Sequence, residues 1–87
     1  SNRDLYEINM KLMILNLSRR TTEAQLRDLF SPFGVVDACN LVMDVDKDKS
    51  KGFGFVEMPN KDEANRALEA LNEKRVQTKR IKVKEAN

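Results

Sequence analysis

The sequence contains no histidine, no tryptophan and only one cysteine, Cys39. Without histidine, neither a Ser-His-acid catalytic set nor an ordinary zinc site can be assembled. A single cysteine cannot form an intramolecular disulfide, and this favours a reducing compartment. We therefore expect a protein that is not an enzyme and that has no metal and no cofactor.

Long hydrophobic runs are also missing. The most apolar stretch, residues 10–17 (MKLMILNL), is interrupted by a lysine and an asparagine and is too short to cross a membrane. No basic and apolar leader of the secretory kind opens the sequence. We expect a cytoplasmic protein, or a nuclear one in a nucleated cell, with no membrane partner.

The 87 residues, 40% hydrophobic and 34% charged, suit one small globular domain. We expect an N-terminal extension or lead-in over residues 1–10 and a domain over residues 11–87. The net charge is only +2, but residues 74–84 (KRVQTKRIKVK) hold six basic residues and no acid. Such a segment fits contact with a polyanion, although lysines also protect exposed strand edges from pairing.

Apolar spacing predicts two helices and four strands. In residues 21–30, Leu26, Leu29 and Phe30 recur at helical spacing, and a second amphipathic helix is predicted over residues 60–72. The predicted strands cover residues 11–16, 35–43, 51–58 and 80–84. The order β-α-β-β-α-β is that of the ferredoxin-like split motif, an α+β sandwich. Two helices cover one face of a four-stranded sheet, so the other face is left bare.

The third predicted strand, residues 51–58 (KGFGFVEM), shows which side chains lie on the bare face. Alternate residues of a strand share a side, so Lys51, Phe53 and Phe55 point the same way as Glu57. Unpaired charges are rarely buried, and these phenylalanines are therefore predicted to lie on the bare face. The strand's two glycines face the other side, where we expect a helix backbone to approach closely.

This octamer resembles that of the RNA-recognition motif, K/R-G-F/Y-G/A-F-V-x-F/Y, at seven of eight places. Met58 stands where an aromatic residue is usual. Residues 12–17 (LMILNL) are similar to the family's first-strand hexamer, with Met13 in place of the aromatic residue. The octamer begins 39 residues after the hexamer (51 minus 12), a spacing typical of the family. TTEAQLRDLFSPFG and RIKVKEA are also similar to its first helix and last strand, so the resemblance covers about residues 11–86.

The resemblance implies a sheet of order 4-1-3-2 that binds single-stranded RNA, with single-stranded DNA as a second ligand, as a monomer. It implies that Phe55 stacks beneath one base, that Phe53 packs against ribose and that Lys51 meets a phosphate. Met13 stands where the preceding base would stack. The other implied contact residues are Asn40 and Val42 on the second strand and Lys82 and Lys84 on the last.

The methionine at position 13 supports an alternative to the RNA-binding function. Stacking of a base on an aromatic ring is worth roughly 1–3 kcal/mol, and a thioether lacks the flat area of a ring. We therefore predict weaker or less discriminating RNA binding than a fully aromatic surface would give. One hypothesis is that Tyr6 supplies the missing ring. The alternative function is an RNA-recognition-motif-like protein-interaction module with weak or no RNA binding.

Residues 44–50 (DVDKDKS) place three aspartates at the first, third and fifth positions of a calcium-loop pattern. Lys49 stands where that pattern needs glycine, and Phe55 stands where it needs glutamate. We expect a solvated hairpin here in place of a calcium site. The family resemblance implies that Lys47 or Lys49 of this hairpin can touch RNA.

Overall fold

The computed structural model describes residues 9–86, and its helices and long strands follow the predicted order, with one further pair of short strands. In chain order they are β1 (Met10–Leu15), α2 (Glu23–Phe30), the 3-10 turn η1 (Ser31–Phe33), β2 (Ala38–Asp44), β3 (Lys49–Met58), α3 (Lys61–Leu71), β4 (Arg75–Val76), β5 (Lys79–Arg80) and β6 (Lys82–Glu85). The further pair is the short β4–β5 hairpin. Because residues 79–80 pair within this hairpin, the last strand of the main sheet begins at residue 82 and not at 80 as predicted.

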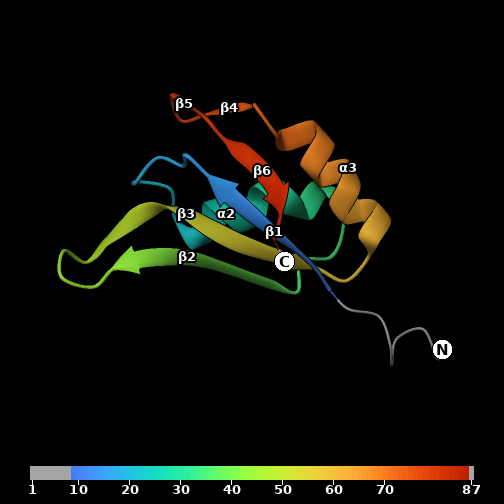
Figure 1. The fold of residues 1–87 in the computed structure, drawn as a ribbon, viewed down its shortest axis with the longest axis horizontal. Helices are drawn as coiled ribbons and strands as arrows, with labels where there is room; N and C mark the ends of the chain where they lie inside the picture. The colour runs from blue at the N-terminus through green and yellow to red at the C-terminus, as the bar shows by residue number, and fades with distance from the viewer. Residues whose placement is uncertain (1–8, 87) are drawn as a thin grey trace.

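The four long strands form one antiparallel sheet in the order β2-β3-β1-β6 (Figure 1). Numbered within this sheet and read from the opposite edge, the order is 4-1-3-2, so the predicted ferredoxin-like α+β fold is confirmed. The second strand begins three residues later than predicted. Residues 35–37 form a connection instead, in which the Val35 N–H donates to the Glu63 carboxylate and the Val36 carbonyl accepts from Arg27.

A side-chain cap marks the start of each helix. The Thr22 hydroxyl accepts the Gln25 N–H while the Gln25 side chain accepts the Thr22 N–H, which is a complete capping box at the start of α2. At the start of α3, the Asn60 side chain accepts the Glu63 N–H. These bonds satisfy N–H groups that the first turn of a helix otherwise leaves without partners.

The hydrophobic core lies between the sheet and the two helices. Along the central strands, burial alternates: Leu12 and Ile14 of β1 and Val56 and Met58 of β3 are buried, and their neighbours are more exposed. Phe30 of α2 is the largest side chain that is fully buried. The core therefore occupies one face of the sheet, and the side chains between its members point to the other face, which is called the open face below.

Cys39 belongs to this core, and burial raises the pKa of its thiol. In the part of the chain that the structure describes, no helix is long and apolar enough to cross a membrane.

The expectation that a helix backbone approaches the two glycines of β3 is wrong. A Cβ atom on Gly54 would lie 2.4 Å from the carbonyl oxygen of Asn40, on the neighbouring strand β2. Gly52 has a φ of +86°, and a Cβ atom there would lie 3.0 Å from the carbonyl oxygen of Leu17, in the loop between β1 and α2. Both glycines therefore make room for backbone within or beside the sheet, and the helices are not involved.

Candidate nucleic-acid interface

One row of residues crosses the open face through all four strands. Asn40 of β2 is the Cα partner of Phe55 on β3, Phe55 is the partner of Met13 on β1, and Met13 is the partner of Lys84 on β6. Asn40 and Lys84 are exposed, and the two central side chains are partly exposed. The pairing thus brings four of the seven predicted site residues into one line, with the polar and charged members at its ends.

Phe53 lies beside this row and contacts Phe55 edge to face. The ring centroids are 6.4 Å apart and the ring planes meet at 77°. This T-shaped arrangement is one of the preferred geometries for an aromatic pair. The two rings therefore present different surfaces: a base can stack on one while the other offers an apolar wall to the neighbouring sugar.

Lys11 is a residue of this interface that the sequence analysis missed. Its Nζ lies 4.6 Å from the centroid of the Phe55 ring, within range of a cation–π contact. The alternation that placed Phe53 and Phe55 on the open face, applied to β1, places Lys11 beside Met13 on that face. The signal was therefore present in the sequence. Lys11 also has Glu57 as its Cα partner on β3.

Lys82 points to the open face, but its ammonium is already engaged. It donates to the Glu73 carboxylate and forms an ion pair with it. The hydrogen bond from Lys82 lowers the pKa of the Glu73 carboxyl. Because this pKa is lowered, the Glu73–Lys82 pair stabilises the folded state at pH values above the ordinary glutamate pKa. That contribution is lost as the pH falls through the lowered pKa. The positive charge of Lys82 at the interface is therefore balanced by the negative charge of Glu73.

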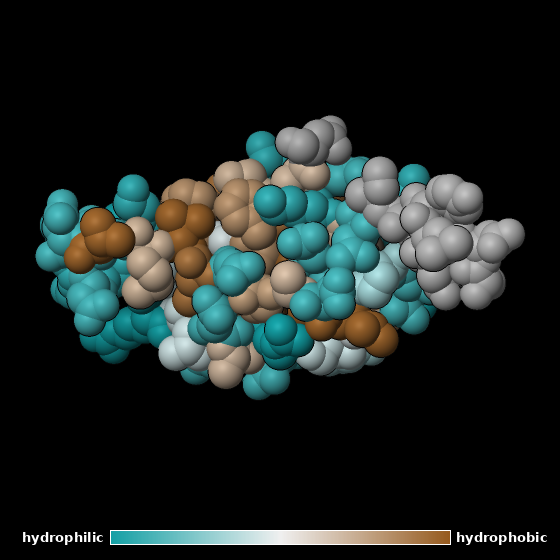
Figure 2. Space-filling view, turned by 90° about the horizontal axis from the view of Figure 1, so that it is seen from below, coloured by the Kyte–Doolittle hydropathy of each residue, from teal (hydrophilic) through white to brown (hydrophobic). Residues whose placement is uncertain are grey.

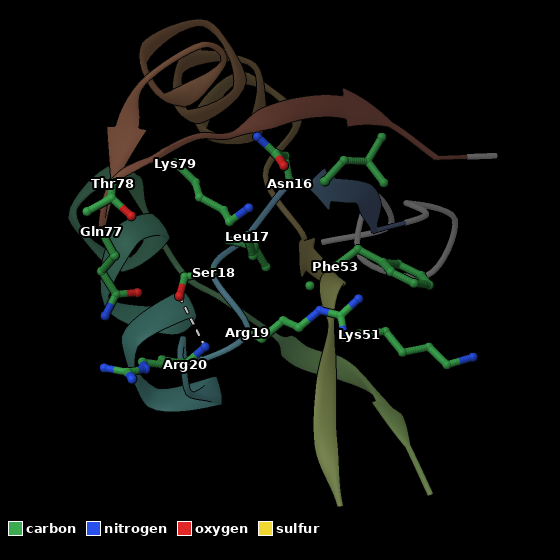
Figure 3. A pocket seen from close by; sticks show the side chains of 12 residues that line it. Asn16, Leu17, Ser18, Arg19, Arg20, Lys51, Phe53, Gln77, Thr78 and Lys79 are labelled. Atoms are coloured by element: carbon green, nitrogen blue, oxygen red, sulfur yellow. Dashed lines mark hydrogen bonds between the residues drawn. The ribbon is translucent and has the colours of Figure 1, made fainter. Parts of the chain in front are cut away.

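Lys51 and Phe53 also line a groove of about 850 Å³ at one end of the open face (Figure 3). The groove's other walls are the loop between β1 and α2 and the turn of the β4–β5 hairpin. The sequence analysis did not predict this hairpin, and it therefore missed the groove.

Three further described residues from the sequence analysis lie outside the row. Val42 falls where the pairing of β2 with β3 changes register, and it is partly buried. Lys47 lies in the turn between β2 and β3, Lys49 is the first residue of β3, and both are exposed. Tyr6 lies outside the described residues.

The β2–β3 hairpin uses its first aspartate to close a turn: the Asp44 carboxylate accepts the Asp46 N–H at 3.1 Å. Within residues 9–86, no three histidine, cysteine, aspartate or glutamate side chains are grouped so that they could hold a metal ion. The chemistry that the open face offers is therefore aromatic contact and positive charge.

Comparison with known proteins identifies the family. The family model described as the RNA recognition motif matches residues 12–82. The chain belongs to the RNA recognition motif family. This membership supports RNA binding in general, and members of the family are generally non-catalytic.

Relatives agree with this assignment. The domain is 48% identical over 61 residues to Protein elav of Drosophila melanogaster, a match that covers 70% of this chain and 13% of that protein. Among solved structures, RNA binding protein PG1 has a TM-score of 0.86 at 36% identity, with 88% of this chain and 93% of that chain covered. The Sxl-lethal protein/RNA complex also gives a TM-score of 0.86, at 30% identity, with 92% and 48% covered. The domain spans only 12–14% of the length of the first curated relatives that it matches.

Proposed function

We propose that this RNA-recognition-motif domain binds single-stranded RNA across its open face, as a monomer. In this proposal one base stacks on Phe55, a ribose packs against Phe53 and phosphates meet Lys51 and Lys84. The observation that carries the proposal is the row from Asn40 to Lys84, with two partly exposed phenyl rings at its centre. Every base has a π face, so exposed rings bordered by lysines suit a single strand.

The distribution of charge supports a polyanion. Acidic residues at this face have basic neighbours: Glu57 is the register partner of Lys11, and Glu73 pairs with Lys82. Lys51 and Lys84 then supply positive charge on either side of the phenyl rings. The solved complex of a relative with RNA, at 30% identity, supports the same ligand class.

The distribution of apolar surface favours RNA over a protein partner. Seen from the β2 edge, hydrophobic residues lie interspersed with hydrophilic ones (Figure 2). Among the described residues, the exposed large hydrophobic side chains are Val35, Met43 and Val45, and none of them belongs to the row. A protein-docking site usually offers a larger contiguous apolar patch.

Stacking and phosphate contacts are available from DNA as well as from RNA. Single-stranded DNA is therefore proposed as a second ligand, and any preference for RNA has to come from contacts with the 2′-hydroxyl group.

The first test is the salt dependence of RNA binding. We expect labelled random-sequence RNA octamers to bind, with log K falling linearly as log salt rises. Each neutralised phosphate on a single strand contributes a slope of about −0.7, so contacts from Lys51 and Lys84 predict a slope of about −1.4. Fluorescence anisotropy at several salt concentrations measures it. Failure to bind RNA at low salt, together with a protein partner whose capture requires Phe55, would instead establish the protein-interaction function.

The second test separates Lys84 from Lys82. Lys84→Gln is expected to flatten the salt slope by about 0.7, because one phosphate contact is lost. The double variant Glu73→Gln/Lys82→Gln removes a neutral pair, and we expect it to keep a slope close to that of the wild type. If the double variant flattens the slope as much as Lys84→Gln does, then Lys82 leaves Glu73 and contacts the phosphate itself.

A further inference from the structure

The groove at the end of the open face is strongly basic. Four of its twelve lining residues are cationic, namely Arg19, Arg20, Lys51 and Lys79, and none is acidic. The cations come from three separate segments: the β1–α2 loop, the start of β3 and the β4–β5 hairpin. In Figure 3, the Arg19 side chain extends from its loop toward Lys51 and Phe53, and Lys79 points in from the hairpin. Arg20 and Lys51 extend outward in the same view, so Arg19 and Lys79 are the two cations that reach into the groove. Two cations that enter from different walls favour an anion in the space between them.

Hydrogen bonds hold these walls at fixed positions. The Leu17 N–H donates to the Gly52 carbonyl at 2.8 Å, which ties the β1–α2 loop to β3. The Asn16 side-chain amide donates to the carbonyl of Arg80 at 2.9 Å, which ties the same loop to the hairpin. The Arg19 stem lies beside β3, because a Cβ atom on Gly52 would be 3.9 Å from the Arg19 Cγ, an ordinary van der Waals distance.

The β4–β5 hairpin, which forms one wall of the groove, has unfavourable backbone dihedral angles at its turn. Gln77 and Thr78, at the turn, have φ values of 48° and 73°, in the left-handed region that side chains rarely adopt. Thr78 is β-branched, for which this region is least favourable. A hydrogen bond from the Thr21 hydroxyl to the Gln77 side chain, 2.5 Å long, holds the turn against α2. Strain that the surrounding structure maintains in this way is concentrated at functional sites.

We propose that this groove is a second RNA subsite, which holds the sugar–phosphate backbone of nucleotides flanking those on the sheet. The inference rests on the proposed function, because Lys51 and Phe53 belong both to the open face and to the groove and so make one continuous surface. Its volume of about 850 Å³ is within the range of small-molecule sites and has room for nucleotide-sized groups. The hydroxyl and amide groups of Ser18, Gln77 and Thr78 supply donors beside the cations.

The experiment compares two lengths of random-sequence RNA on the full chain. Two or three bases occupy the aromatic surface of such a sheet, so a tetranucleotide covers the row while a decanucleotide also reaches the groove. For the decamer, Arg19→Gln/Lys79→Gln is expected to flatten the salt slope by about 1.4, for two lost phosphate contacts. For the tetramer we expect little change. The control Lys61→Gln/Arg66→Gln removes two exposed charges from α3 and is expected to leave both slopes unchanged.

The outcomes separate this inference from the proposed function. If the tetramer binds through Phe55 but the groove variant keeps the wild-type slope with the decamer, the subsite is wrong and the sheet interface stands. Equal losses from the groove variant and the α3 control would show a general charge effect and also overturn the subsite. If the wild type binds neither RNA, both proposals fail. All four replaced residues are exposed, so loss of folding is not expected to obscure the result.

Discussion

Replacing Phe55 with alanine is expected to weaken binding of single-stranded RNA by about 1–3 kcal/mol, a loss of about 5- to 150-fold. The ring lies at the centre of the row, between Asn40 and Met13. Met13 has no ring, so in the proposed interface Phe55 carries the main stacking surface, and we expect no compensation from β1. Anisotropy titrations with random-sequence octamers at fixed salt measure the effect.

Two further substitutions show whether stacking is the cause. Phe55→Tyr keeps the ring and is expected to bind almost as well as the wild type, whereas Phe55→Leu keeps apolar area without a flat π surface and is expected to bind poorly. Because Phe55 also contacts Phe53 and Lys11, thermal unfolding of each variant checks that the fold persists. Unchanged affinity in Phe55→Ala contradicts the proposed interface, and wild-type affinity in Phe55→Leu contradicts stacking.

The face on which Phe53 and Phe55 lie could be predicted from the sequence because a strand has a period of two. Charged residues at both ends of the alternating set exclude the core, and this reasoning needs no partner strand. The same reasoning applied to residues 10–15 would have found Lys11. The row from Asn40 to Lys84 is different, because it depends on the register of three strand pairs, which no single strand determines.

The β4–β5 hairpin could not be predicted, for a physical reason. Tight hairpin turns with left-handed residues usually carry Asn-Gly or Asp-Gly, and here they carry Gln77 and Thr78. The turn is held by a hydrogen bond from Thr21, which is 56 positions away in the sequence. The groove and the pairing of Lys82 with Glu73 likewise depend on tertiary contacts, so local sequence patterns carried no signal for them.

Gly54 leads to the second large prediction. Glycine within a strand ordinarily costs about 0.5–1 kcal/mol relative to alanine, so strand propensity alone predicts that Gly54→Ala stabilises the domain. The structure predicts the reverse. A Cβ atom would lie 2.4 Å from the Asn40 carbonyl oxygen, and this contact is with backbone, which cannot rotate away as a side chain can. Strands β2 and β3 would have to separate at this point.

We expect Gly54→Ala to lower the free energy of unfolding by about 1–3 kcal/mol, the usual cost of overpacking. In a domain of this size, each 1 kcal/mol lowers Tm by about 4–8 °C, so thermal unfolding resolves the effect. RNA affinity should fall as well, because a shift of β2 moves Asn40 away from Phe55. The control is the pair Asn40→Ala and Asn40→Gly, at an exposed position of β2, where alanine is expected to be the more stable. The family octamer allows glycine or alanine at this place. If Gly54→Ala matches or exceeds the wild type in stability, the close approach of β2 to β3 does not exclude alanine in this chain.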